Sequence, residues 1–170
     1  MKQILKYIYE RLLDNMKFAE GKHAVTIALA SAVIVFAINF LNLSTPFVAT
    51  LSAGCIVFSL ISILYSFIAL SARKVKIGDF KGKEGIKYNL MYYKNIILFD
   101  EDTYISTIKT QYNLPKAYRP DEQDRDFARQ IISVAKVTNL KFSYFNLSLL
   151  FLFLSLLCAV ATILILGLNL

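Results

Sequence analysis

Two long stretches without a charged residue constrain the fold of this chain more than any other feature. Ala24–Leu43 contains no Asp, Glu, Lys or Arg, and neither does Phe47–Ala72. An α-helix of ~20 mostly apolar residues crosses the ~30 Å hydrocarbon core of a bilayer, and both stretches reach that length. Only Ser44, Thr45 and Pro46 lie between them, which suffices for a tight turn. The sequence therefore predicts a transmembrane hairpin.

A third apolar stretch, Phe145–Leu168, lies near the end of the chain. No Pro or Gly occurs between Asp121 and Leu166, so we expect one long helix whose first ~20 residues are cytoplasmic and whose remainder spans the membrane. With 56% hydrophobic residues in 170, the composition is that of a membrane protein. The predicted fold is an all-α integral membrane protein with three transmembrane helices, the hairpin and a C-terminal span, and a helical cytoplasmic layer.

The predicted organisation has five segments. They are a cytoplasmic amphipathic helix (1–22), the first transmembrane helix (23–43), the second (47–72), a cytoplasmic helical insert (73–142) and the third transmembrane helix (143–168). The first segment runs directly into the second, and Gly21 is the one residue that could mark a bend between them. Within the insert, Asp100–Thr103 and Asp121 with Asp124 are typical of helix starts. Residues 86–99 fit either a short helix or an extended segment.

The distribution of charge predicts the topology. Five of the 19 Lys and Arg residues precede the first span, and the other fourteen lie between the second and third spans. Because basic segments remain on the cytoplasmic side, we expect the N-terminus and residues 73–142 to be cytoplasmic and the C-terminus to lie outside. The expected location is the inner membrane of a cell, as a multi-pass protein in contact with lipid.

Small polar residues follow one face of the second span. Ser59, Ser62 and Ser66 recur at helical spacing, and two interpretations are open, a helix-packing face or the lining of a pore. Cys55 and Cys158 both fall inside predicted spans, where we expect small apolar packing residues. Three spans of one subunit enclose little of a pore, so a pore would require a homo-oligomer.

Enzymatic chemistry finds no support in the sequence. The chain lacks a Ser/His/Asp set, an HExxH motif, paired cysteines at metal spacing and a Walker motif. We therefore expect no catalytic residue, no metal and no cofactor. Neither DNA nor RNA is an expected partner, because no nucleic-acid-reading motif is present.

Basic residues on the predicted last helix form the best candidate for a ligand site. An Arg guanidinium can bind a phosphate through two parallel hydrogen bonds, and a Tyr ring offers a stacking surface. This combination suits an anionic ligand with an aromatic base. The candidates are Lys22, His23, Arg125, Arg129, Lys136 and Lys141, with Lys74, Lys76, Tyr88, Tyr92 and Tyr93 in support. The alternative is a solvated, positive-inside face whose cations pair with Asp126 and Glu122. For His23 the alternative is an interfacial residue at the mouth of the first span.

Two motifs resemble those of a known family. Phe18–Ala24 is similar to the "FAD-x-K-A" motif before the first span of the Pycsar transmembrane effectors. Asp126–Ile131, followed by Lys141, Phe142 and Asn146, resembles their "DLARQI…K(F/Y)…N" helix, and the order of hairpin, insert and closing span is also similar. We accordingly assign Glu20, Asp126 and Asn146 as candidate relay residues.

The resemblance implies a role in bacterial anti-phage defence. A partner nucleotide cyclase would make cyclic UMP or cyclic CMP, and the effector would sense it through its cytoplasmic part and then impair the membrane. Two other functions stay open, a non-enzymatic membrane scaffold that docks a soluble partner, and a related defence effector that responds to a different nucleotide.

Overall fold

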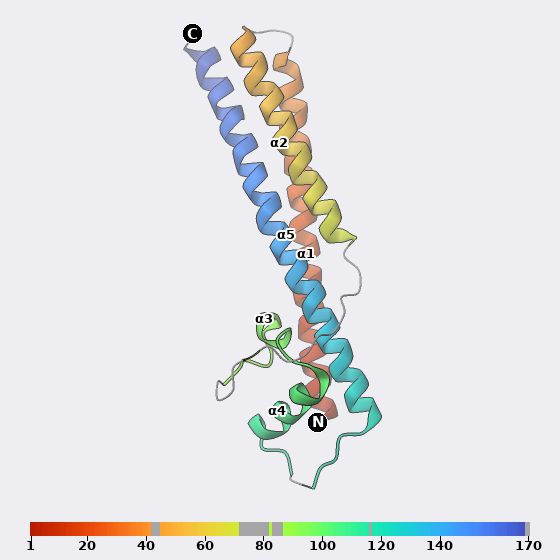
Figure 1. Ribbon diagram of the computed structural model, residues 1–170. Coiled ribbons are helices and arrows are strands. Elements are labelled where there is room, and N and C mark those ends of the chain that lie inside the picture. The colour runs from red at the N-terminus through yellow and green to blue at the C-terminus, as the bar shows by residue number, and fades with distance from the viewer. Residues whose placement is uncertain (42–44, 72–81, 83–86, 116, 169–170) are drawn as a thin grey trace. The chain divides into compact units, whose positions relative to one another are not determined.

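The computed structural model describes residues 1–41, 45–71, 82, 87–115 and 117–168 (Figure 1). Over these residues the chain forms five helices and no strand. They are α1 (Lys2–Leu41), α2 (Pro46–Leu70), α3 (Tyr93–Ile96), α4 (Glu101–Gln111) and α5 (Glu122–Gly167). The predicted all-α class is confirmed, and α1, α2 and α5 are long and apolar enough to cross a membrane.

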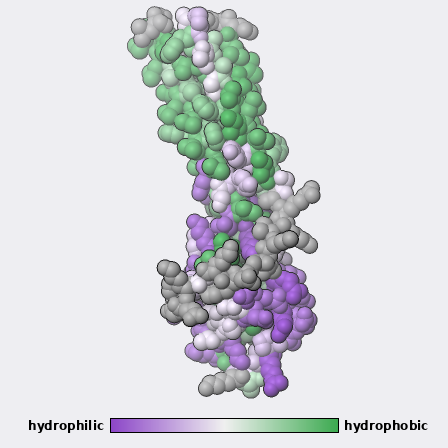
Figure 2. Space-filling view, in the orientation of Figure 1, coloured by the Kyte–Doolittle hydropathy of each residue, from purple (hydrophilic) through white to green (hydrophobic). Residues whose placement is uncertain are grey.

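The chain divides into two compact units. Unit 1 consists of Met1–Phe18 and Ala72–Lys141, and unit 2 consists of Ala19–Ser71 and Phe142–Leu170. Hydrophilic residues gather on the surface of unit 1 and hydrophobic residues on that of unit 2 (Figure 2). The membrane limits proposed from the sequence stay a prediction. Most of the basic stretch 73–85, including Lys74 and Lys76, and the turn residue Ser44 lie outside the described residues.

Two helices contribute residues to both units. The predicted continuous last helix is confirmed, since α5 has 46 residues without a break. Helix α1 is also continuous over 40 residues, so the helix does not end at Gly21. A single glycine weakens a helix by about 1 kcal/mol, and the helical residues on both sides of Gly21 offset that cost.

Gly21 provides a first test of this continuity. A Cβ added at Gly21 meets no atom within 4 Å, so Gly21→Ala should raise the free energy of unfolding by up to about 1 kcal/mol. Thermal unfolding in detergent, followed by circular dichroism, measures the change. Gly167→Ala is the matched control, because its Cβ is equally free but the residue ends α5. A lower melting temperature for Gly21→Ala alone would show that α1 needs a flexible residue there.

The core of unit 1 is an apolar cluster contributed by one face each of α1, α4 and α5 and by residues around α3. Its fully or almost fully buried members include Leu5, Ile8, Leu12, Leu90, Ile96, Phe99, Tyr104, Ile108, Ala128, Ile131, Ile132 and Ala135. Asp100 caps α4, since its Oδ1 accepts a hydrogen bond from the Thr103 amide at 2.8 Å, and this confirms the predicted helix start. Residues 86–99 prove mostly non-helical where described, with α3 as a single turn.

The start of α5 is fixed by reciprocal capping. The Asp124 amide donates to Asp121 Oδ1 at 2.9 Å, and the Asp121 amide donates to Asp124 Oδ2 at 3.3 Å. Lys2 Nζ lies 2.9 Å from Asp121 Oδ2, and this contact holds the pKa of Asp121 below its usual range. The Tyr118 hydroxyl donates to Asp124, which raises the pKa of Tyr118 to about 12. The helix start predicted at Asp121 is thereby confirmed.

In unit 2, α1, α2 and α5 pack through a strict alternation of three- and four-residue spacings. On α2 the buried residues are Val48, Ser52, Cys55, Ser59, Ser62, Ser66 and Ala69. This 3.5-residue period is that of left-handed helix packing, and its small residues allow close approach in a bilayer. Of the alanines in the first span, Ala30 and Ala37 are buried. Cys55 and Cys158 are free thiols, as expected for packing residues.

Hydroxyl groups join α2 to α5 inside unit 2. Ser59 Oγ lies 2.8 Å from Ser155 Oγ, and Ser62 and Ser66 Oγ lie 3.0 and 2.8 Å from Ser148 Oγ. These five serines, which we call the hydroxyl seam, are all buried. The packing interpretation is therefore confirmed, although the serines bond across the two helices and not only to carbonyls of their own helix.

Candidate functional site

The six residues predicted to bind a ligand are divided between the two units. Lys22 and His23 belong to unit 2, whereas Arg125, Arg129, Lys136 and Lys141 belong to unit 1. Arg125 is exposed, Lys136 is half-buried, and Lys141 is only 3% exposed. Their shared role in binding stays a prediction.

Arg129 is engaged by two carboxylates. Its Nε and Nη2 atoms lie 3.1 Å from Glu101 Oε2, and its Nη1 lies 3.1 Å from Asp126 Oδ1. The alternative of a solvated face whose cations pair with acids is correct in naming Asp126 as a partner. The second acid that contacts Arg129 is Glu101 of α4, and not Glu122. Helix α4 packs on α5 in the core of unit 1, and that long-range contact brings Glu101 to Arg129. An Arg that already holds two acids has less capacity for a phosphate.

Lys22 and His23 belong to a separate cluster in unit 2. Lys22 Nζ lies 5.5 and 4.9 Å from the ring centroids of Phe142 and Phe145, a cation–π arrangement. His23 is fully buried, with Nδ1 3.2 Å from Ser66 Oγ and its ring edge-on to Phe145. The structure thus places His23 at the end of the hydroxyl seam, and its position at the membrane interface stays a prediction.

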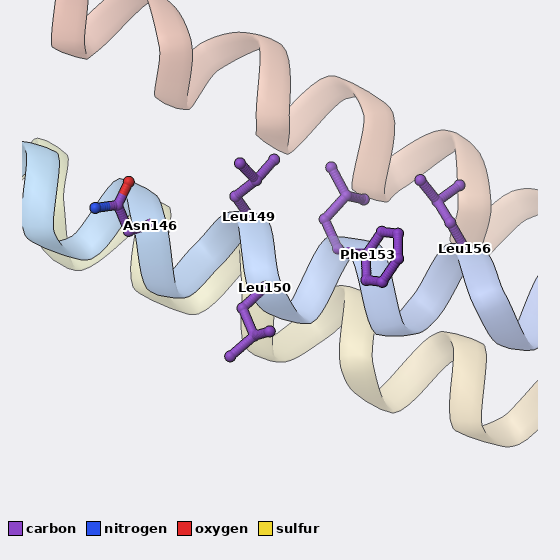
Figure 3. A pocket seen from close by; sticks show the side chains of 6 residues that line it. Asn146, Leu149, Leu150, Phe153 and Leu156 are labelled. Carbon is purple, nitrogen blue, oxygen red and sulfur yellow. The ribbon is translucent and has the colours of Figure 1, made fainter.

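The three candidate relay residues occupy different settings. Glu20 is half-buried on α1, and Asp126 is exposed and ion-paired with Arg129. Asn146 is exposed on α5 and lines an open groove of about 540 Å³ together with apolar side chains of the same helix (Figure 3). The other lining residues are Leu149, Leu150, Leu152, Phe153 and Leu156. Because this groove has no cation and lies on a predicted span, it suits lipid chains and not a nucleotide.

A different set of residues forms a polar cleft in unit 1. Its volume is about 270 Å³, and we call it the Arg11 cleft. Its lining consists of Arg11 and Asn15 from α1, and of Asn89, Met91, Tyr92 and Tyr93 from the segment that leads into α3. Arg11 and Asn15 are four residues apart and therefore share one face of α1.

The wall opposite α1 is a fixed turn. Asn89 Oδ1 accepts a hydrogen bond from the Met91 amide at 3.0 Å, and the Tyr92 amide donates to the Asn89 carbonyl at 3.1 Å. Leu90 is buried in the core, where its carbonyl accepts a hydrogen bond from the Tyr104 hydroxyl at 3.0 Å. Burial raises the pKa of Tyr104 far above its usual value, so the phenol remains a donor.

The Tyr104 hydroxyl gives a direct test of how this wall is held. Tyr104→Phe removes the bond to Leu90 and leaves a buried carbonyl without that donor, which should cost about 1–2 kcal/mol of stability. Denaturant or thermal unfolding of the purified protein measures the loss. Tyr112→Phe is the control, because Tyr112 also packs on the core of unit 1 but is only half-buried. Equal stability of the two variants would contradict an anchoring role for Tyr104.

Among the described residues that line the cleft, Arg11 carries the one formal charge. None of the ion pairs among the described residues involves Arg11, whose guanidinium donates only a long contact of 4.0 Å to Met91 Sδ. The rings of Tyr92 and Tyr93 lie 4.9 Å apart at 55°. Partial burial, and to a lesser degree Tyr92, raises the pKa of Tyr93, so the Tyr93 phenol is neutral near pH 7.

Sequence reasoning found part of this cleft. Tyr92 and Tyr93 are among the predicted stacking residues, but Tyr88 packs edge-on to Phe99 in the core. Arg11 was missed, because on the sequence it is one of several charged residues on the polar side of an amphipathic helix. The Arg11–Asn15 spacing is the one local signal, and the partner wall lies about 80 residues away in the chain.

Comparison with known proteins places the chain in a family. No curated protein and no solved structure matches it significantly. A family model described as the Pycsar effector protein domain matches residues 4–168, nearly the whole chain. Together with the three membrane-length helices, this match shows that the chain is a multi-pass membrane protein of the Pycsar effector family, a membrane effector of anti-phage defence.

Proposed function

We propose that this protein is a nucleotide-gated effector, in which unit 1 binds a cyclic pyrimidine mononucleotide and unit 2 then impairs the inner membrane as a homo-oligomer. A nucleotide cyclase supplies cyclic UMP or cyclic CMP on infection. The effector itself performs no catalysis and needs no metal or cofactor. Residues 1–22 and 73–142 are cytoplasmic in this scheme, as the distribution of Lys and Arg favours.

The observation that carries the proposal is the sharing of α1 and α5 between the two units. Each helix contributes buried residues to the core of unit 1, such as Leu12 and Ile131, and continues as a membrane-length helix in unit 2. A ligand that favours one arrangement of the unit 1 core therefore acts on helices that unit 2 also uses. Such a ligand shifts the equilibrium only by its differential affinity for the two arrangements.

The membrane step follows from the same interfaces. When α2 and α5 separate, the hydroxyl seam becomes a polar surface within the span, and several subunits can line an opening with it. In the resting state those hydroxyls satisfy one another, which keeps the span apolar toward lipid.

The test is permeability to a dye that intact membranes exclude, in cells that express this protein with or without a pyrimidine cyclase. Dye entry only with an active cyclase supports the proposal, and a catalytically inactive cyclase is the control. Dye entry with a purine cyclase alone would indicate a related effector with a different nucleotide. No entry under any condition, with the protein present in the membrane fraction, would favour a scaffold that docks a soluble partner.

A further inference from the structure

We propose that the Arg11 cleft is the nucleotide-binding site, with Arg11 on the phosphate and Tyr92 or Tyr93 against the base. This inference rests on the proposed function and assigns residues to it. Three kinds of group meet in one cleft and indicate the ligand class. They are the guanidinium of Arg11, which is in none of the ion pairs among the described residues, partly exposed aromatic rings, and side-chain amides.

Arg11 provides the anion-binding group. A guanidinium binds a phosphate through two parallel hydrogen bonds, and Arg11 is exposed and forms none of the ion pairs among the described residues. By contrast, Arg129 already holds Glu101 and Asp126. Among the arginines of unit 1 for which contacts are described, Arg11 combines this freedom with a place in a cleft that also holds aromatic rings.

A second hollow beside Arg11 helps to locate the ligand. It measures about 280 Å³ and is lined by Tyr7, Glu10, Arg11 and Asp14. Its two carboxylates repel a phosphate, whereas no acid is found among the described residues that line the Arg11 cleft. An anion held by Arg11 is therefore favoured on the side of Asn15 and the tyrosines.

The rings and amides fit a nucleobase. Tyr92 is 41% exposed, so part of its ring is accessible for stacking. Asn89 uses its Oδ1 on the Met91 amide and retains its NH₂ group as a donor, and Asn15 adds a second amide. Together they can satisfy the carbonyl and amine groups of a base edge.

The size of the cleft limits the ligand to one nucleotide. About 270 Å³ lies just below the usual range of small-molecule pockets, which suits a compact, internally closed mononucleotide and not a dinucleotide. The site also joins α1 to the Asn89–Tyr93 segment, which Leu90 ties to the core. A bound nucleotide thus bridges α1 to the rest of unit 1, and α1 continues into unit 2.

The experiment measures binding of cyclic UMP and cyclic CMP to the purified full-length protein in nanodiscs by calorimetry. We expect Arg11→Gln and Tyr92→Leu each to weaken binding at least about tenfold. The first variant loses the bidentate contact to the phosphate, and the second loses the stacking contact to the base. Arg11→Lys keeps the positive charge but cannot form the two parallel hydrogen bonds of a guanidinium. Its affinity should therefore lie between those of the wild type and Arg11→Gln. Lys17→Gln is the matched control, since it removes an exposed positive charge from α1 outside the cleft and should change affinity less than about twofold.

The outcomes separate this site from the proposed function. If Arg11→Gln and Tyr92→Leu bind the nucleotide as tightly as the wild type does, the proposed site is wrong. The same holds if Arg125→Gln loses binding instead. Either result leaves nucleotide gating intact. Absence of wild-type binding to both nucleotides overturns the proposed function, the sensing of cyclic pyrimidine mononucleotides. Because Arg11 and Tyr92 are exposed, unchanged melting temperatures are expected and confirm that lost binding is not lost folding.

Discussion

Replacement of Ala135 by proline is expected to abolish cyclase-triggered dye entry. Ala135 is fully buried in the core of unit 1, and its position lies within the unbroken helix α5. Proline removes the amide donor at this position and clashes with the carbonyl of Ile131 one turn earlier, at a cost of about 3 kcal/mol or more. The helix kinks there, and a change in unit 1 no longer reaches the residues of α5 in unit 2.

Two measurements separate loss of transmission from loss of folding. Ala135→Gly keeps the backbone hydrogen bond and costs about 1 kcal/mol, so it should retain dye entry. Calorimetry of nucleotide binding reports whether unit 1 of the proline variant remains folded. If Ala135→Pro, present in the membrane at the wild-type level, still admits dye on activation, then the continuity of α5 is not the transmitter.

The features that sequence reasoning predicted correctly are those with a local physical cause. The spans follow from uncharged stretches of membrane length, and the starts of α4 and α5 follow from Asp100 and Asp121, whose side chains cap amides three residues ahead. The unbroken α5 follows from the absence of Pro and Gly. Each of these signals lies within one helix, and packing elsewhere in the chain does not change it.

The features that it missed depend on residues distant in the chain. Glu101 reaches Arg129 across 28 residues, and the partners of Ser62 on α5 lie 86 residues away. The sequence of one helix does not show which acid or hydroxyl of another helix will contact it, because that depends on the register in which the two helices pack. The Arg11 cleft is the same case, since its two walls meet only after α1 and the Asn89–Tyr93 segment have packed on one core.

Ser148 shows how such a long-range contact becomes a prediction with a large effect. It is fully buried, and its Oγ lies 2.8 Å from Ser66 Oγ, 3.0 Å from Ser62 Oγ and 2.8 Å from the Ser62 carbonyl. In return, Ser62 Oγ donates to the Ser148 carbonyl at 2.8 Å. This site is the most densely bonded part of the hydroxyl seam.

Ser148→Leu is expected to make the membrane permeable to dye without any cyclase. The larger side chain overpacks the interface at a cost of about 1–3 kcal/mol, and it also removes the hydroxyl that Ser62 and Ser66 share. Both effects favour separation of α2 from α5, the arrangement proposed for the active state. Growth arrest on expression and dye entry are the measurements, at matched amounts of protein in the membrane.

Ser148→Ala separates the two causes. It removes the hydroxyl without adding volume, and hydrogen bonds between membrane helices average about 0.6 kcal/mol, so its effect on stability should be smaller. If the bonds themselves hold the resting state, the alanine variant should respond to less cyclase than the wild type but remain closed without it. If Ser148→Leu stays closed and still responds normally, separation of α2 from α5 is not the step that opens the membrane.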